Sequence, residues 1–142
     1  MKYTHSSHSV YYLQYHVIVT CKYRKKVLKP GVVAYMEEFL PTLLKEMPGV
    51  SLEEIGFDKD HVHMLLTIPP TFAIADVVAR LKSRSASRLR KKFAWLGKVY
   101  WKENVVWSDG YFVSSVGVDE DTVKRYVKHQ ARQDSMREQL EL

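Results

Sequence analysis

The sequence predicts an α+β fold in a single domain, residues 1–142, and three features of the chain indicate it. Short segments rich in Val, Ile, Tyr and Thr are typical of strands. Two longer segments repeat apolar residues every three or four positions, as amphipathic helices do. Hydrophobic residues make up 46% and charged residues 27%, which is ordinary for a globular chain of one core. Intrinsic disorder and fibrous repeats are therefore excluded.

The predicted elements follow the order strand, helix, strand, strand, helix, strand. Pro30 and Gly31 separate the first strand from the first helix, and Lys59 and Asp60 form the turn between the second and third strands. This order is typical of a ferredoxin-like, RRM-like antiparallel sheet with helices on one face and the other face open. The elements are expected at residues 10–21, 32–47, 51–58, 61–68, 73–93 and 99–116.

A last helix is expected to follow the sheet at the carboxyl end of the chain. Asp119 stands where an N-cap belongs, and acidic residues follow it in the first turn. Basic residues come later, where they complement the negative end of the helix dipole. The fold is therefore expected to carry an appended C-terminal helix that includes Tyr126.

Cysteine content and hydropathy restrict the cellular setting. The single Cys21 excludes an internal disulfide framework, and no run approaches the ~18 consecutive apolar residues of a membrane-spanning helix. Residues 1–9 are polar and lack the apolar core of a secretory signal. We therefore expect a soluble, cytoplasmic protein with no membrane partner.

Basic residues are concentrated in one part of the chain. The net charge is +6, yet residues 77–102 alone contain nine basic residues and no acidic one, so the rest of the chain is net negative. Such a field attracts polyanions, of which nucleic acid is the usual example. The alternative is a basic helix face that only meets solvent.

Two histidines stand at alternate positions of the third predicted strand. Side chains alternate between the faces of a strand, so His61 and His63 share one face while Val62 and Met64 point to the other. The apolar face must meet the helices, which leaves both imidazoles on the open face, where they could bind one divalent cation. The plainer alternative is two histidines on an exposed strand.

Tyr126 and Gln130 are one turn apart on the same face of the last predicted helix. Gln130 could supply a third metal ligand, with His129 as a rival, and Tyr126 could serve as a nucleophile. The alternative is that Tyr126 is a core aromatic residue. Taken together with His61 and His63, these residues suggest a metal ion that acts as a Lewis acid on a phosphodiester while a phenol attacks phosphorus.

The sequence resembles a known family at this point. The strand His61, Val62, His63, the segment from Val106 to Gly117, and Tyr126 with Gln130 are similar to the small single-tyrosine HUH transposases. These are the TnpA proteins of the IS200 class of insertion sequences. The resemblance covers nearly the whole chain.

The resemblance implies a metal-dependent transposase that acts on single-stranded DNA. By analogy, His61, His63 and Gln130 would bind Mg²⁺ or Mn²⁺. Tyr126 would attack the DNA backbone and become joined to a 5′ phosphate, leaving a free 3′ hydroxyl. The resemblance also implies recognition of DNA hairpins and a homodimer in which the tyrosine helix of one subunit completes the site of the other.

Candidate DNA-binding residues are assigned from the two basic clusters. A row of basic residues along a helix could hold phosphates with strongly salt-dependent affinity. The candidates are Lys22, Arg24, Arg80, Lys82, Arg84, Arg88, Lys91 and Lys92.

Three other functions remain open. A host-owned HUH relative that acts on repeated palindromes would use the same chemistry on a different DNA. A non-catalytic RNA- or DNA-binding module would share the order of elements, but it would leave His61, His63 and Gln130 without a role. A structural protein with a basic surface is the third.

Overall fold

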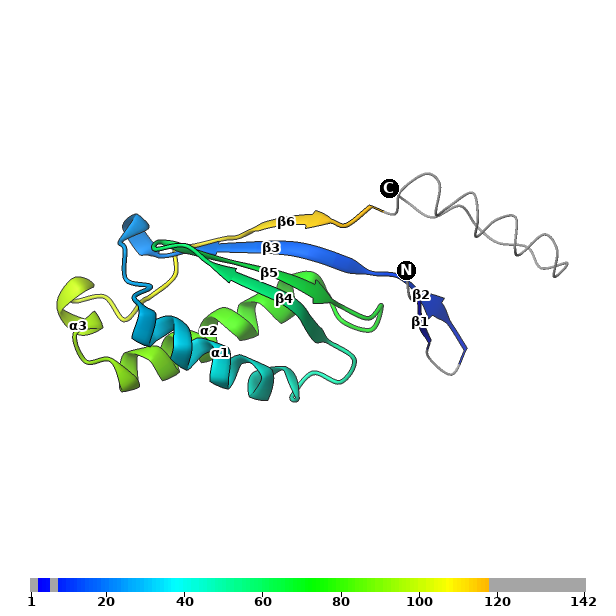
Figure 1. The fold of residues 1–142 in the computed structure, drawn as a ribbon, viewed down its shortest axis with the longest axis horizontal. Helices are drawn as coiled ribbons and strands as arrows, with labels where there is room; N and C mark the ends of the chain where they lie inside the picture. Colours follow the sequence, from blue (N-terminus) through cyan, green and yellow to red (C-terminus); the bar gives the residue numbers. More distant parts are fainter. Residues whose placement is uncertain (1–2, 6–7, 118–142) are drawn as a thin grey trace, which may run out of the picture.

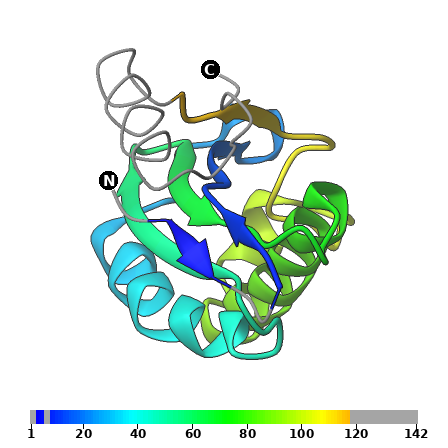
Figure 2. The same ribbon diagram turned by 90° about the vertical axis from the view of Figure 1, so that its right-hand side faces the viewer.

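A four-stranded antiparallel sheet forms the centre of the computed structural model, which describes residues 3–5 and 8–117. The strand order across the sheet is β4-β5-β3-β6, and two long helices cover one of its faces (Figures 1 and 2). The expected α+β fold, with helices on one side of an antiparallel sheet, is confirmed. The strands are β3 (Gln14–Thr20), β4 (Ser51–Phe57), β5 (His61–Thr67) and β6 (Phe112–Ser115).

The two helices and the covered face of the sheet share one apolar core. Helix α1 (Pro30–Leu44) starts with a proline, whose fixed φ suits the first helical position. Helix α2 (Ile74–Lys92) buries Val77 and Leu81 against the sheet. Each fully buried Val or Leu contributes about 1.5–3 kcal/mol relative to its exposed state. This core fixes which side of each strand meets solvent.

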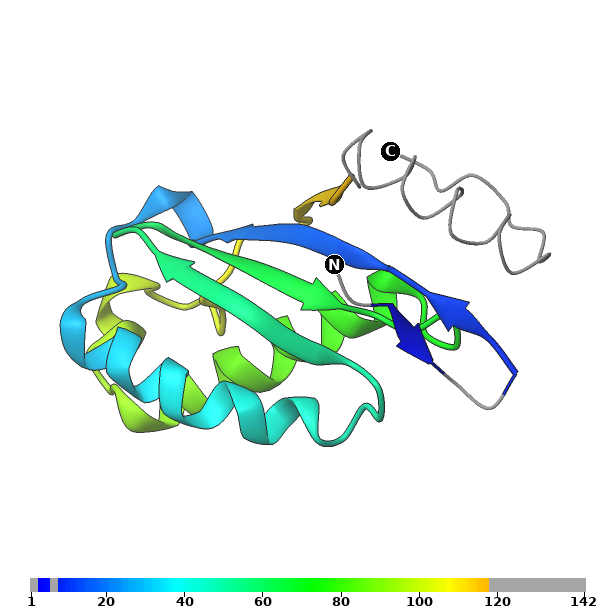
Figure 3. The same ribbon diagram turned by 45° about the vertical axis from the view of Figure 1, so that its right-hand side comes forward.

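The amino-terminal region contains more elements than expected. The strand predicted at residues 10–21 is divided into β2 (Val10–Tyr11) and β3, and β2 pairs with β1 (Thr4–His5). This small hairpin projects beyond one end of the main sheet (Figure 3). A 3₁₀ turn, η1 (Lys22–Arg24), follows β3.

The region between α2 and β6 differs from the prediction. One or two strands were expected at residues 99–116, and one is present, β6. Earlier in this region, Trp107 forms only an isolated β-bridge to Cys21. The start of that region belongs to a short helix, α3 (Leu96–Val99), because Leu96 and Tyr100 are both buried one turn apart. The helix expected from Asp119 lies outside the described residues. Within the described part of the chain, no helix is long and apolar enough to cross a membrane.

Candidate functional site

The histidine pair lies on β5, an inner strand between β4 and β3. Val62 and Met64 are buried beneath the sheet, 2% and 5% exposed, whereas His61 is partly exposed and His63 is exposed. Both imidazoles therefore occupy the face opposite α1 and α2, as the alternation of the sequence predicts. We call this the open face.

Carboxylates surround the imidazole of His61. Its Nδ1 lies 2.9 Å from Asp60 Oδ1, and its Nε2 lies 3.4 Å from Asp58 Oδ2. Asp60 also accepts a hydrogen bond from Arg24 Nε at 3.2 Å. The hydrogen bond from His61, together with Arg24, lowers the pKa of Asp60 against the opposing effect of desolvation. In the tautomer that carries its proton on Nδ1, His61 donates to Asp60, and its Nε2 lone pair faces the carboxylate of Asp58. A cation bound at Nε2 would therefore lie beside a second carboxylate.

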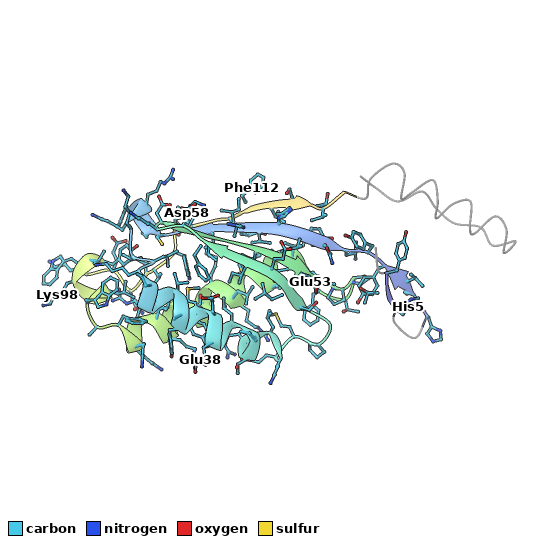
Figure 4. All side chains as sticks on the ribbon, viewed as in Figure 1. His5, Glu38, Glu53, Asp58, Lys98 and Phe112 are labelled. Carbon is cyan, nitrogen blue, oxygen red and sulfur yellow. The ribbon has the colours of Figure 1, made fainter. Side chains whose placement is uncertain are left out.

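His63 lies directly above the backbone of β4. Its cross-strand partner there is Gly56, and a Cβ built on Gly56 would overlap His63 Nε2. On the other side His63 pairs with Ile18, which pairs in turn with Phe112. Phe112 is 57% exposed, and Figure 4 shows it on the side of the sheet away from the helices. The missing side chain of Gly56 thus makes the space that His63 occupies.

The imidazoles of His61 and His63 could supply two of the ligands of a divalent cation. Two neighbouring imidazoles, one of them oriented by a carboxylate, form the kind of partial ligand set that catalytic metal sites use. Among the described residues, however, no group of three His, Cys, Asp or Glu side chains is arranged to hold a metal. Tyr126, Gln130 and His129 lie outside these residues, so their predicted roles remain predictions.

The predicted basic residues of η1 lie beside the histidines. Arg24 is exposed and bonded to Asp60, as described above, and Lys22 Nζ lies 3.8 Å from Asp109 Oδ2. A positive backbone φ at Tyr23 and Arg24 shapes this turn. The turn therefore brings two cations to the end of the sheet that carries His61.

The predicted basic residues of α2 divide into three groups. Arg88 and Lys92 lie over aromatic rings of α1, and Arg84 pairs with Glu46, just after α1, at 3.0 Å. Lys82 donates to the carbonyl oxygens of Ser108 and Gly110 at 2.8 and 2.7 Å. Desolvation lowers the pKa of this ammonium group. The remaining two, Arg80 and Lys91, are exposed to solvent.

Several residues of the site were not found by the sequence analysis. Asp58 precedes the turn before His61, Asp60 lies in that turn, and Gly56 makes room for His63. An isolated glycine inside a strand commonly marks a close approach by another group. That signal marks Gly56 as a candidate, but the group that approaches it follows only from the register between β4 and β5.

Residues 9–130 match a protein family described as "Transposase IS200 like". This segment includes the β5 histidines, Tyr126 and Gln130. The chain belongs to the IS200-like transposases. The family predicted from the sequence motifs is therefore confirmed, and membership supports a transposase function.

Two relatives of known name agree with this family. The transposase for insertion sequence element IS200 of Salmonella typhimurium is 31% identical over 136 residues, which cover 96% of this chain and 88% of the relative. The ISDra2 transposase TnpA of Deinococcus radiodurans is 31% identical over 122 residues, or 85% and 86% of the two chains. The similarity to IS200-like transposases thus extends over most of both relatives.

Solved structures share the fold of this IS200-like transposase. A Deinococcus radiodurans R1 protein, solved as a candidate transposase, has a TM-score of 0.71 at 29% identity and covers 94% of this chain and 99% of its own. A REP-associated tyrosine transposase bound to a REP hairpin has a TM-score of 0.53 at 12% identity, over 91% and 74% of the two chains. The second similarity concerns the fold alone.

Proposed function

We propose that this IS200-like transposase cleaves and rejoins single-stranded DNA through a covalent intermediate on Tyr126. The observation that carries the proposal is the histidine pair on the open face of β5, with His61 oriented by Asp60. An apolar core does not require two imidazoles there, and metal-dependent phosphoryl transfer does use such ligands.

We propose His61, His63 and Gln130 as the ligands of a divalent cation, Mg²⁺ or Mn²⁺. When bound, such an ion polarises a phosphodiester and stabilises the charge that develops on its oxygen atoms. Asp60 would keep the His61 ring in one tautomer and orientation, which is the usual role of a carboxylate behind a metal-binding histidine.

The proposed reaction exchanges one phosphodiester for another. The phenol oxygen of Tyr126 forms a bond to phosphorus, and the bond from phosphorus to the 3′ oxygen breaks. The phenol loses its proton, and the departing 3′ oxygen gains one. The product is a 5′-phosphotyrosine and a free 3′ hydroxyl, so a later attack by a hydroxyl can reverse the step without a nucleotide cofactor.

A hairpin-bearing single strand is the proposed substrate, at the ends of an insertion sequence. Basic residues of η1, and those of α2 that are turned away from α1, supply charge for a phosphate backbone. The structurally similar REP-associated tyrosine transposase is itself bound to a hairpin. For this chain, hairpin recognition and a homodimeric assembly are parts of the proposal.

The experiment follows a covalent adduct. A hairpin-bearing single strand labelled at its 3′ end is incubated with the protein and Mg²⁺, and the products are separated under denaturing conditions. The label should migrate with the protein, because the fragment 3′ of the cut carries the phosphate bound to Tyr126. Tyr126→Phe should abolish the adduct and retain DNA binding, whereas Tyr111→Phe, which changes an exposed tyrosine of the described chain, should retain both.

Metal dependence is tested in the same assay. Chelation, or His63→Ala, should abolish the adduct, and His5→Ala should serve as the matched control because His5 is an exposed histidine in β1. An adduct that forms equally well on metal-free protein would overturn the proposed chemistry. A Tyr126→Phe variant with unchanged activity would instead favour a nucleic-acid-binding module, in which the exposed Phe112 stacks on bases.

A further inference from the structure

We propose that a DNA phosphate backbone runs along one row of α2, formed by Arg80, Ser83, Ser87 and Lys91. We call these four residues the outer row. The identity of the ligand as DNA rests on the proposed function. The choice of this row comes from the contacts of the basic side chains of α2. Some of them, the engaged group, bind a carboxylate, an aromatic ring or a carbonyl oxygen, and the others make no such contact within the described residues.

The first engaged group faces α1. These side chains recur every fourth residue, so they form a single row along the helix. One makes an ion pair and two lie over aromatic rings, where a cation interacts favourably with the ring face. The contacts are Arg84 with Glu46 at 3.0 Å, Arg88 with the Phe39 ring at 5.0 Å, and Lys92 with the Tyr35 ring at 5.5 Å.

The second engaged group binds the chain that follows α2. Lys82 donates to two carbonyl oxygens before β6, as described above. Arg90 donates through Nη1 to the carbonyl oxygens of Leu96 and Val105, at 3.4 and 3.2 Å. Both cations are held against backbone carbonyl oxygens, so they are less available to a phosphate than a side chain without such contacts.

Arg80 and Lys91 have no such engagement. Within residues 3–5 and 8–117, neither forms an ion pair with a carboxylate, and both are exposed. Ser83 and Ser87 are exposed between them and add hydroxyl donors. At a rise of about 1.5 Å per residue, the outer row spans roughly 16 Å. That length matches about five nucleotides of one strand at about 3.4 Å each.

The surface beside the outer row is hollowed. A depression of about 600 Å³ is lined by Ser83, Ser87, Arg90, Lys91 and Asn104, with no carboxylate among these residues. A second depression, of about 480 Å³, meets the first at Ser83 and is bordered by Arg80, but it also contains Asp76. The negative charge of Asp76 opposes phosphate, so the path extends from Arg80 toward the carboxyl end of α2.

The test compares two double variants that remove the same charge from the same helix. Arg80→Gln with Lys91→Gln changes the outer row, and Arg88→Gln with Lys92→Gln changes the row that faces α1. Binding of a fluorescent hairpin oligonucleotide is measured by anisotropy at salt concentrations from 50 to 300 mM. Each lost phosphate contact reduces the slope of log affinity against log salt by about one, so the outer-row variant should lose about two.

The matched variant should keep the wild-type slope within about half a unit. As a check that needs no loss of a cation, Ser87→Asp should weaken binding at least tenfold, whereas Ser51→Asp, at the start of β4, should not. Thermal melting verifies that each variant is folded. Equal losses of slope in the two double variants would overturn the assignment, because they would indicate a diffuse field instead of a path.

Failure of this inference is distinguishable from failure of the proposed function. If wild-type protein forms the Tyr126 adduct and the outer-row variant keeps the wild-type slope, only the path along α2 is wrong. If wild-type protein neither binds the hairpin nor forms the adduct, the proposed function is wrong and the path is overturned with it.

Discussion

His63 owes its position to a residue that has no side chain. Its imidazole fills the space above Gly56 on the neighbouring strand, and a Cβ there would overlap Nε2. Real Cβ atoms essentially never approach a neighbour so closely. Under the proposed function His63 binds a divalent cation, and a metal ligand must be held within a narrow range of positions. Gly56 would then act as a positioning residue for His63.

The substitution Gly56→Ala tests this role. Alanine should displace the imidazole and weaken Mn²⁺ binding about 10- to 100-fold, as loss of supporting residues does in other metal sites. Free Mn²⁺ is measured by electron paramagnetic resonance. Gly31→Ala is the control, because a Cβ at Gly31 meets no atom within 4 Å. Unchanged Mn²⁺ affinity in a folded Gly56→Ala protein would contradict a positioning role.

Strand alternation alone was enough to predict the face that His61 and His63 share. The supporting residues Gly56 and Asp60 were not predicted, because their roles depend on which residue lies opposite on β4 and on the geometry of a turn. Register between strands is a tertiary property that a single sequence shows weakly. Tyr126 and Gln130 lie outside the described residues, so their places in the site remain predictions.

At the scale of elements, α2 holds the segment that leads into β6. Lys82 donates to Ser108 and Gly110 carbonyl oxygens, and Trp107 Nε1 donates to Ser85 Oγ at 2.9 Å. Ser85 and Trp107 are both buried. One helix thereby fixes the start of the strand that completes the sheet.

We expect Lys82→Met to destabilise this attachment. The change removes the charged donor of two carbonyl oxygens that water can partly reach, at a cost of about 0.5–1.5 kcal/mol in the free energy of unfolding. Urea denaturation measures the loss, with the exposed Lys98→Met as control. The sequence analysis assigned Lys82 to DNA. An unchanged stability together with a salt slope reduced by one would favour that assignment over a structural one.

The long elements were predictable and the short ones were not. Helices α1 and α2 and strand β5 have clear apolar periods, and β4 is bounded by turn residues. The observed bounds of all four lie close to the predicted ranges. Helix α3 was missed because Val99, Tyr100 and Trp101 are typical strand residues, while burial of Leu96 and Tyr100 requires a helical turn. The hairpin β1–β2 has only two residues in each strand, too few for a detectable pattern.

At the scale of the whole molecule, the proposed dimer makes a prediction about mixed subunits. Tyr126→Phe and His63→Ala proteins, each inactive alone, are co-expressed with different tags. If the tyrosine helix serves the partner subunit, each heterodimer contains one intact site, and random pairing gives about a quarter of wild-type adduct. The adduct should form only on the His63→Ala chain, which retains Tyr126.

Absence of adduct from purified heterodimers would contradict the exchange of tyrosine helices between subunits. In that case each Tyr126 acts with the histidines of its own chain, and neither subunit of the mixed pair has a complete site. The homodimer itself is tested separately by the mass of the assembly in solution.

Asp60 joins two parts of the molecule, since it accepts hydrogen bonds from both Arg24 and His61. When a polyanion competes for Arg24, the carboxylate of Asp60 is left to His61 alone and becomes a stronger acceptor for its ring proton. The imidazole is then a better electron donor at its opposite nitrogen. Under the proposed function this nitrogen binds a divalent cation. By thermodynamic reciprocity, that cation would then raise the affinity for the polyanion by the same factor, so the two ligands should bind cooperatively.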